Sequence, residues 1–348
     1  MLFRIIRQLS HSTAFRVLAV AAGWLILIWW LHYELNLEHS VRSIIRMGYM
    51  PVITNLSAPL LDHASRNGNG LRFEALKFSS FAEMAESLRN GHIHAAFIIA
   101  PLSIVLHQQG ARIKLVYVGN RHESTLVYRK DLKVSTFRDL ADKTIAVPMR
   151  FSGHNIAARR LAMDFGISGP SLKIVEMNPP DMPSALRSGA LDAYFVGEPF
   201  AAATLHTGES KVLYYVEQVW PGFICNLLIV RQDLIDTKPE WVKNLVEGAA
   251  RSGYWAHGHP KEAAAIAAQY WNQPPELVEY ALRTPRDRIV YDRFVPKQEE
   301  MQFLADQMVR FGLLENNDIN GLIDDRFAKN ADLQHITNNE SILAHLKD

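Results

Sequence analysis

Short apolar runs alternate with amphipathic segments along most of the chain after residue 43. The runs are rich in β-branched and aromatic residues, whereas segments such as SFAEMAESLRNG and HNIAARRLAMDFG place apolar residues at helical spacing. This alternation is typical of βαβ units around mainly parallel sheets, so the sequence predicts an α/β fold. The predicted strands are 44–50, 71–78, 95–100, 114–120, 124–130, 144–148, 172–177, 192–197, 212–217 and 224–230.

The pattern becomes helical throughout after Lys238. Trp241, Leu245, Val246 and Ala249 recur at helical intervals, and we expect further helices through about residue 311. The last stretch, residues 316–348, is polar, and we expect it to be a peripheral C-terminal tail.

The N-terminal segment has a different pattern from the rest of the chain. A basic region, residues 1–16 with Arg4, Arg7 and Arg16, precedes an apolar run over 17–31. This run fits a signal-peptide core and is short for a membrane-spanning helix, which needs about 20 residues. Bulky residues (WWLHYEL) occupy the place where a signal peptidase needs small ones, and no cysteine follows for lipid attachment.

We therefore expect a retained signal anchor over residues 17–34, followed by a polar spacer over 35–43. Trp29, Trp30 and Tyr33 would lie at the membrane interface, and the preceding arginines would keep the N-terminus in the cytoplasm. The remainder would face the periplasm of a bacterium at its inner membrane. The alternative is a cleaved signal peptide and a soluble periplasmic protein.

An internal repeat is the most informative feature of the apolar pattern. EMAESLRNGHIHAAFIIAPL (83–102) aligns without gaps to DMPSALRSGALDAYFVGEPF (181–200). Each copy predicts a helix, a glycine at its left-handed cap, a buried strand, and a proline that opens the next helix. Two such units predict two similar α/β lobes. Chance similarity between generic helix–strand units is the alternative.

Composition narrows the function classes. The net charge is +1 and the basic residues are scattered, so we expect no nucleic-acid partner. The single cysteine, Cys225, excludes internal disulfides and a cysteine-rich metal site, and the histidines do not cluster at metal-ligand spacing. GxSxG, HExxH, GxxxxGK[ST] and GxGxxG are all absent from the sequence, so we expect no catalysis and no cofactor.

The candidate binding residues lie where predicted strands end and helices begin. Ligands of open α/β sheets bind there, and helix N-termini favour anions. Four segments qualify: 51–57, 100–102, 151–155 and 198–200. In the third, Ser152, Gly153 and His154 could present amides, a hydroxyl and an imidazole to an oxyanion. The alternative is that Ser152 or Asn155 simply caps the helix.

Glu198 could accept from a ligand cation or coordinate a metal, or it could cap the following helix through the dipole. Trp220 is a candidate apolar wall, although an aromatic residue is more often core, and Cys225 is most simply a small buried hydrophobe. Further candidates on loops at strand ends, each with a solvated loop residue as the alternative, are Asn55, Ser57, His122, Glu123 and Ser124.

Five stretches carry a resemblance to a known family. They are GYMPVITNLSAPLL, GHIHAAFIIAPLSIVL (with His94 in place of the usual aspartate), TFRDLADKTIAVPMRFSGHNIAARRLA, NPPDMPSALRSGALDAYFVGEPFAAA and ICNLLIVRQDLIDTKPEWVKNLVEGAARSGYW. Together they resemble the nitrate, bicarbonate and sulfonate-type substrate-binding proteins of ABC importers, which have the type II periplasmic binding fold. His154 matches a histidine that nitrate and bicarbonate binders carry in their ligand loop.

The resemblance implies two α/β lobes that close on a small anionic solute and then dock on a permease and its ATPase. Lobe one would be 44–128 plus 225–315, lobe two 129–224, and the crossovers would lie near 127–131 and 222–230. Ser152, Gly153 and His154 would bind the anion from lobe two. Asn55 and the turn at Ala100 and Pro101 would face it from lobe one, and Ser124, Glu198 and Trp220 would line the site.

Two departures leave the ligand open. Nitrate binders carry a basic residue in the second crossover and bicarbonate binders an acidic one, whereas this chain reads WPGFICN. If His154 binds as imidazolium, affinity should weaken above about pH 6.5–7. The alternatives are a membrane-anchored solute sensor, a pyrimidine-precursor binder and, less favoured because its motif is cysteine-rich, a pyrimidine-synthase type enzyme.

Overall fold

The computed structural model describes residues 13–36, 42–68, 70–167 and 169–343. The chain divides into two compact units, Met1–Ser43 and Ile44–Asp348. The predicted basic region up to residue 12, spacer residues 37–41 and the last five residues of the predicted tail lie outside the described part, as do the side chains of residues 33–36.

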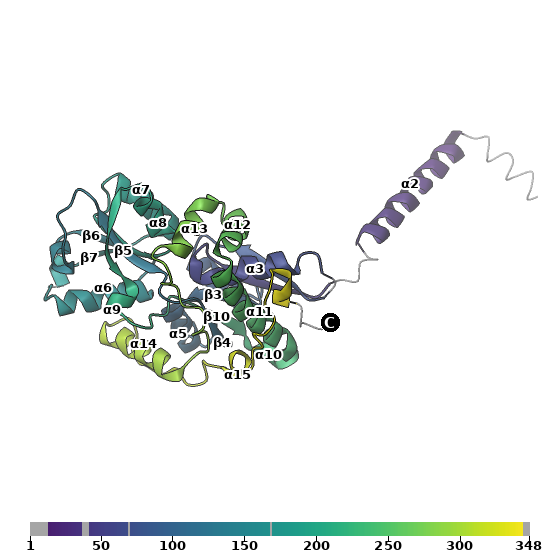
Figure 1. Cartoon of the computed structure of the whole chain (residues 1–348). Coiled ribbons are helices and arrows are strands. Elements are labelled where there is room, and N and C mark those ends of the chain that lie inside the picture. Colours follow the sequence, from purple (N-terminus) through teal and green to yellow (C-terminus); the bar gives the residue numbers. More distant parts are fainter. Residues whose placement is uncertain (1–12, 37–41, 69, 168, 344–348) are drawn as a thin grey trace, which may run out of the picture. The chain divides into compact units, whose positions relative to one another are not determined.

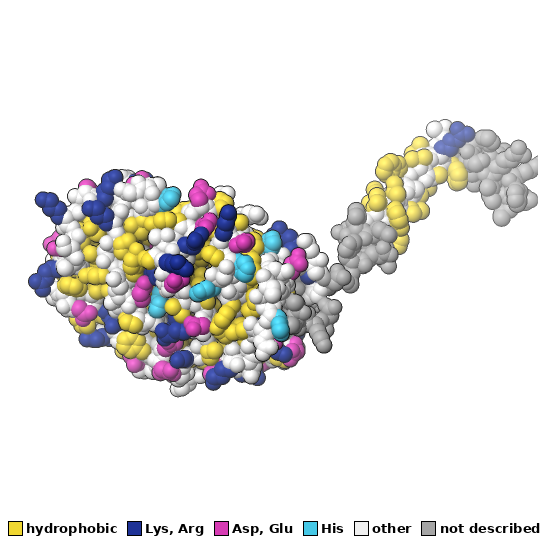
Figure 2. All heavy atoms as spheres, viewed as in Figure 1, with side chains coloured by type: hydrophobic (Ala, Val, Ile, Leu, Met, Phe, Trp, Pro, Cys, Tyr) yellow, Lys and Arg dark blue, Asp and Glu magenta, His cyan; other side chains and the backbone are white. Residues whose placement is uncertain are grey.

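The first unit contains helix α2 (Thr13–Asn36), drawn in purple in Figure 1. Its 18-residue window Phe15–His32 has a mean hydropathy of 1.7 and no buried residue. On the face in view, apolar side chains predominate over the part of the helix whose side chains are described (Figure 2). At 1.5 Å per residue the helix is about 36 Å long, enough for a hydrocarbon core of about 30 Å. By length and composition α2 could cross a membrane, and a signal sequence would meet the same criterion.

The second unit is built on two five-stranded sheets (Figure 1). All ten predicted strands are present. The first sheet contains β1 (Ile44–Tyr49), β2 (Arg72–Lys77), β3 (Ala95–Ile99), β4 (Ile113–Val118) and β10 (Asn226–Arg231). The second contains β5 (Ser124–Arg129), β6 (Thr144–Val147), β7 (Lys173–Glu176), β8 (Ala193–Gly197) and β9 (Ser210–Tyr215).

Both sheets have the same topology. Their orders are β2-β1-β3-β10-β4 and β7-β6-β8-β5-β9. In each sheet, the strand that follows a passage from the other sheet, β10 or β5, lies between the third and fourth of the remaining strands. That strand is antiparallel in both sheets. It starts at Asn226 opposite Ile99 in the first sheet and at Ser124 opposite Gly197 in the second. Asn226 and Ser124 therefore occupy equivalent positions at the carboxyl edges.

The repeat predicted from the sequence is visible in local contacts. Asp192 accepts a hydrogen bond from the Thr144 amide at 2.9 Å, and His94, at the equivalent position, accepts one from the Arg46 amide at 3.0 Å. The imidazole thus replaces the usual carboxylate as a backbone acceptor. Gly91 and Gly189 have φ of 76° and 80°, as a left-handed helix cap requires.

Helices cover both faces of each sheet, because alternate strand residues belong to different cores. In the first sheet, Phe97 and Leu228 face one core, which the helices of residues 239–283 complete. Ile98 and Leu227 face the opposite core, which the helices of residues 81–89, 100–108 and 298–310 complete. The α-helices are α3 (Ser57–Ser65), α4 (Phe81–Arg89), α5 (Ala100–Gln108), α6 (Gly153–Asp164), α7 (Met182–Arg187), α8 (Phe200–Leu205), α9 (Val216–Val219), α10 (Gln232–Thr237), α11 (Pro239–Gly258), α12 (Pro260–Trp271), α13 (Pro275–Arg283), α14 (Gln298–Arg310) and α15 (Arg326–Lys329). Short 3₁₀ helices are η1 (Ile53–Asn55), η2 (Phe137–Leu140), η3 (Gly169–Ser171), η4 (Pro179–Asp181) and η5 (Glu340–Leu343).

The strand pairing shifts the predicted lobe boundary. We placed residues 44–128 in lobe one, but β5 pairs with β8 and β9 and so belongs to the second sheet. The chain passes between the sheets at 119–123, here called the first crossover, and at 220–225, the second crossover. The predicted crossovers at 127–131 and 222–230 extended into β5 and β10, because the apolar pattern of a strand does not reveal which sheet it joins.

The C-terminal segment is not peripheral, so that prediction was wrong. Ile319, Leu322 and Ile342 are buried in the cores of the first lobe. Arg251, itself fully buried on α11, donates hydrogen bonds to the carbonyls of Asp332, Gln334, Ser341 and Ile342. A few buried apolar residues and the hydrogen bonds of Arg251 thus hold this otherwise polar C-terminal segment against the first lobe.

Candidate functional site

The carboxyl edges of the two sheets meet directly. The amide of Ile53 in η1 donates to the carbonyl of Glu198, which follows β8, at 2.8 Å. The four predicted segments at strand ends all lie at these edges. Around this contact the structure gathers six buried polar residues, here called the seam cluster: Glu123, Ser124, Thr125, His154, Glu198 and Arg288.

His154, the second residue of α6, is central to the seam cluster. Its Nε2 lies 2.9 Å from Ser124 Oγ and 4.0 Å from Cys225 Sγ. The rings of Phe195 and Phe223 lie edge-on to the imidazole at 5.3 and 5.4 Å. Its Nδ1 is buried and has no hydrogen-bond partner within the part of the chain that the structure describes.

Burial lowers the pKa of His154 to about 3. With a side chain 1 % exposed and aromatic rings on two sides, the imidazole is neutral at physiological pH. The structure therefore gives no support to the imidazolium form that we considered for anion binding. A neutral ring still offers one N–H donor, whose position depends on the tautomer.

Two carboxyl groups flank His154. Glu123 accepts from the Ser124 hydroxyl at 2.9 Å and from the Glu198 amide at 2.8 Å, and burial raises its pKa to about 7. Glu198 accepts from the Thr125 hydroxyl at 2.8 Å and from the Ala202 amide at 2.7 Å. Burial also raises the pKa of Glu198. The second contact is the capping role that we weighed for Glu198, since Ala202 lies in the first turn of α8.

Arg288 supplies the positive charge of the seam cluster, and sequence analysis missed it. It lies between α13 and α14, yet it donates to Thr125 Oγ1 at 3.1 Å and to the Ser124 carbonyl. It also pairs with Glu217 at 2.9 Å and stacks over the Tyr215 ring at 4.3 Å. All these partners are at least 70 residues distant in sequence, so no local pattern identified it.

Ser152 and Gly153, which we expected to bind an oxyanion together with His154, contact other parts of the protein instead. Ser152 Oγ accepts from the Asn155 amide at 3.1 Å, so Ser152 is the N-cap of α6, as in the alternative that we considered. A Cβ on Gly153 would lie 2.7 Å from the Phe223 ring, which therefore covers the start of α6. Of the three predicted residues, only His154 presents a free polar atom of its side chain.

The residues predicted from the first lobe are also buried and bonded. Asn55 donates to the Met50 carbonyl at 2.9 Å and accepts from Asn226 at 2.8 Å. The Ala100 amide donates to the Cys225 carbonyl at 2.9 Å, and Pro101 is buried behind it. Thr54, the neighbour of Asn55, has a buried Oγ1 with no hydrogen-bond partner of ordinary geometry among the described residues. The sequence did not single out Thr54.

The remaining candidates lie around the crossovers. His122 accepts from the Gly222 amide at 3.3 Å, linking both crossovers, and Ser57 donates to the Ala249 carbonyl at 2.9 Å. Trp220 lies outside the seam cluster, against Phe223 at 5.5 Å. Burial raises the pKa of the Cys225 thiol well above its ordinary value, so it is a neutral thiol. Within the described ranges, no three His, Cys, Asp or Glu side chains converge to hold a metal ion.

Comparison with known sequences and structures gives related proteins. The profile of the NMT1-like family matches residues 43–272, more than half of the chain. The "Taurine-binding periplasmic protein" of Escherichia coli (strain K12) is 28% identical over 193 residues, which is 54% of this chain and 58% of that protein. The chain thus spans little more than half the length of that relative.

Solved structures share the fold at low identity. The periplasmic nitrate-binding protein NrtA from Synechocystis PCC 6803 has a TM-score of 0.75 at 16% identity, covering 84% of this chain and 88% of that one. The desulfurization enzyme DSZB has a TM-score of 0.60 at 16% identity, covering 83% and 99%. The fold therefore occurs both in binding proteins and in an enzyme. The choice between these functions depends on the residues of the seam cluster and not on the fold.

Proposed function

Because the chain belongs to the NMT1-like family, we propose that it is the periplasmic solute-binding component of an ABC importer. Its ligand is a small anion or an organic sulfonate-like solute, and it binds where the two sheets meet, beside His154. The two lobes open about the crossovers, admit the solute and close on it, and the loaded form docks on a permease driven by an ATPase.

The observation that carries the proposal is His154 Nδ1, a buried nitrogen with no hydrogen-bond partner among the described residues. In the facing lobe, Thr54 Oγ1 is also buried, and within the described residues its only polar neighbour is the weakly bonding Cys225 thiol. A buried hydrogen-bonding atom left unpaired costs about 1–3 kcal/mol. The Cys225 thiol interacts with the Thr54 hydroxyl, and its Sγ lies 4.0 Å from His154 Nε2, the ring nitrogen that also contacts Ser124. A solute oxygen bound at Nδ1 would satisfy that buried nitrogen.

Glu123 selects the tautomer that an anion needs. When Glu123 is protonated, it donates to Ser124, Ser124 donates to His154 Nε2, and the ring proton resides on Nδ1, where it can bind an anion. When Glu123 is ionised, Ser124 donates to it instead, and Nδ1 becomes an acceptor. Raising the pKa of Glu123 to about 7 keeps the anion-binding tautomer populated near neutral pH.

The proposal involves no chemical step on the solute. The Cys225 thiol is 4 % exposed and its raised pKa keeps it protonated, so it is unsuited to act as a nucleophile. His154 already shares its Nε2 with Ser124 and is enclosed by two aromatic rings.

Binding can be tested by isothermal titration calorimetry with taurine, short alkanesulfonates, nitrate and bicarbonate. We expect one of these to bind the wild-type protein and to bind S124A and H154Q at least about tenfold more weakly, as loss of a buried hydrogen bond predicts. S252A is the matched control, because Ser252 is equally buried on α11 but bonds only to the Gly248 carbonyl. Equal affinities in S124A and S252A, or no binding of any small anion, would contradict the proposed site. Turnover of a bound solute would contradict the binding-only role, and a partner other than a permease would favour the sensor.

We also propose that α2 remains attached and anchors the protein to the inner membrane. Support comes from its length and from its exposed apolar side chains. Intact-mass measurement of the protein from membranes of an expressing bacterium should give a chain that still contains residues 13–36. A soluble periplasmic product lacking these residues would identify α2 as a cleaved signal peptide.

A further inference from the structure

A second hollow lies beside the second crossover, away from the seam cluster. It has a volume of about 340 Å³, a size typical of small-molecule sites. One wall comes from α6 in the second lobe, one from α14, and the floor from residues 220–224. Because α14 packs with the first lobe, both lobes line this pocket.

Arg160 on α6 is the cation of the pocket. Its guanidinium lies 4.8 Å from the centre of the Trp220 ring and 5.5 Å from that of Phe303. Contacts with the ring faces leave the guanidinium plane available for hydrogen bonds, and Nη1 is buried with no hydrogen-bond partner among the described residues. Such a donor is complementary to an oxyanion.

Two carboxylates also line the pocket, and only one of them is committed elsewhere. Glu300 accepts from both Nη atoms of Arg121 at 2.9 Å and pairs with Arg293 at 3.4 Å. Glu299, exposed at the rim, has no ion pair or hydrogen bond with any residue in the described part of the chain. The pocket therefore holds a cation and a rim carboxylate that form no close ion pair within the described residues, although the charges of Asp164 and Arg310 also act on Arg160.

We propose that this pocket binds a small zwitterion with an apolar body, such as a free amino acid. Its acid group accepts a hydrogen bond from Arg160 Nη1, its ammonium group pairs with Glu299, and its apolar part packs against the edge-to-face pair of Trp220 and Phe303. A simple anion satisfies only Arg160 and is repelled by Glu299, whereas a zwitterion satisfies both Arg160 and Glu299.

Occupancy of the pocket connects the lobes. The ligand touches α6 and α14 at once, and these helices already meet where Arg310 approaches Met163 Sδ at 3.1 Å. A ligand that contacts both lobes stabilises the arrangement in which the pocket exists. The proposal does not depend on the identity of the transported solute.

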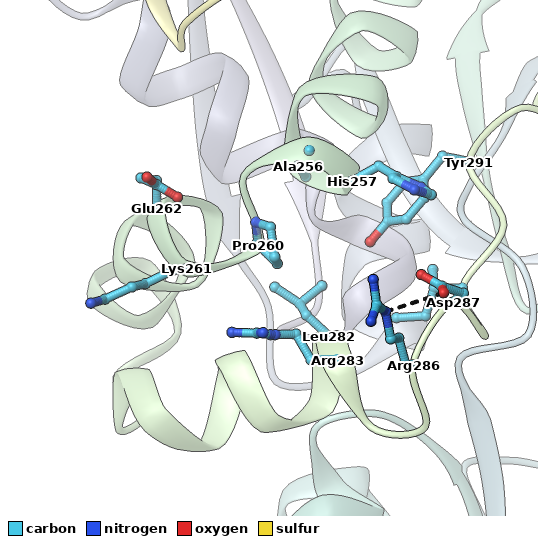
Figure 3. A pocket seen from close by; sticks show the side chains of 12 residues that line it. Ala256, His257, Pro260, Lys261, Glu262, Leu282, Arg283, Arg286, Asp287 and Tyr291 are labelled. Atoms are coloured by element: carbon cyan, nitrogen blue, oxygen red, sulfur yellow. Dashed lines mark ion pairs between the residues drawn. The ribbon is translucent and has the colours of Figure 1, made fainter.

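A contrasting pocket provides the control. It lies between α11, α12 and α13, with the side chains shown in Figure 3. Arg286 and Asp287 form an ion pair there at 3.3 Å, drawn as a dashed line, and Arg283 pairs with Glu279 at 2.8 Å. These arginines form close ion pairs, whereas Arg160 forms none within the described residues.

The test is calorimetric titration of the full chain with L-leucine and L-phenylalanine, with 4-methylpentanoate and L-leucinamide as partners lacking the ammonium or the acid. We expect one of the two amino acids to bind and each single-charge analogue to bind at least about tenfold more weakly. R160L should abolish the signal, and E299Q, which changes only an exposed rim residue, should weaken it by about fivefold or more. R283L, in the pocket of Figure 3, should leave it unchanged.

Three outcomes would overturn the proposal: no binding of either amino acid, equal binding by R160L or E299Q and the wild type, or loss of binding in S124A. The last result would place the amino acid at the seam cluster instead. Retained amino-acid binding in S124A, together with loss in E299Q, separates this pocket from the proposed solute site.

Discussion

Substituting glutamine for Glu123 and for His154 should tilt the pH dependence of stability in opposite directions. The E123Q variant should gain stability relative to the wild type as the pH rises from about 4.5 to 7, by about 3 kcal/mol. The H154Q variant should lose stability relative to the wild type as the pH rises from about 3 to 6.5, by about 5 kcal/mol. The difference between each variant and the wild type gives the contribution of the residue that was replaced.

The signs follow from the direction of each pKa. Folding raises the pKa of Glu123 from 4.5 to about 7, so its favourable contribution is complete below pH 4.5 and is lost as the pH rises through 7. Folding lowers the pKa of His154 from 6.5 to about 3, so its contribution is present above pH 6.5 and is lost as the pH falls toward 3. In the wild type the two slopes largely cancel between pH 4.5 and 6.5. The groups that face Glu123 are Cys225, Ser124, Glu198 and Arg288, and the raised pKa of Glu198 acts in the same direction as that of Glu123.

Urea unfolding followed by tryptophan fluorescence at a series of pH values measures these slopes. E276Q and H92Q make the same substitutions on the exposed surface and serve as controls for the substitution itself. Curves for E123Q or H154Q that run parallel to the wild type would mean that these groups titrate in the fold as they do in the unfolded chain.

Replacing Arg121 by methionine should destabilise the protein by about 3–5 kcal/mol, the cost of breaking a buried ion pair from one side. Arg121 lies in the first crossover and is 1 % exposed. It donates to the Gly222 carbonyl of the second crossover at 2.8 Å, to the Arg293 carbonyl at 2.9 Å, and to both oxygens of Glu300 on α14. The variant leaves these acceptors unpaired where the two crossovers and α14 meet.

R293M is the matched control, since Arg293 pairs with the same Glu300 at 3.4 Å but is 45% exposed. An exposed pair contributes about 1 kcal/mol or less, so R293M should unfold at nearly the wild-type urea concentration. The double variant R121M/E300Q should lose less unfolding free energy than the two single variants lose together, because it leaves no uncompensated charge. A loss below about 1 kcal/mol in R121M would show that the crossovers are held by their backbone contacts instead.

The seam cluster divides into a part that the sequence could suggest and a part that it could not. Strand-end positions pointed to His154, Ser124 and Glu198, and the resemblance also pointed to His154 and Glu198. The structure places all three in the seam cluster. Ser152 and Glu198 also illustrate the limit of this reasoning, since each caps a helix, and a cap and an anion ligand require the same residue types at the same place. Arg288 and Thr54 had no local signal at all.

The sequence by itself determined the strands, the helices and the duplication of one α/β unit at a constant offset of 98 residues. These features depend on which neighbouring side chains are buried, and a period of two or of 3.6 residues records that burial directly. Tertiary structure alone decided which sheet β5 joins and that Ile319, Leu322 and Ile342 enter the core. It also decided that Arg288, Arg121 and Arg251 each connect distant segments. A buried guanidinium binds whichever acceptors the fold brings near, and their sequence separation leaves no periodic trace.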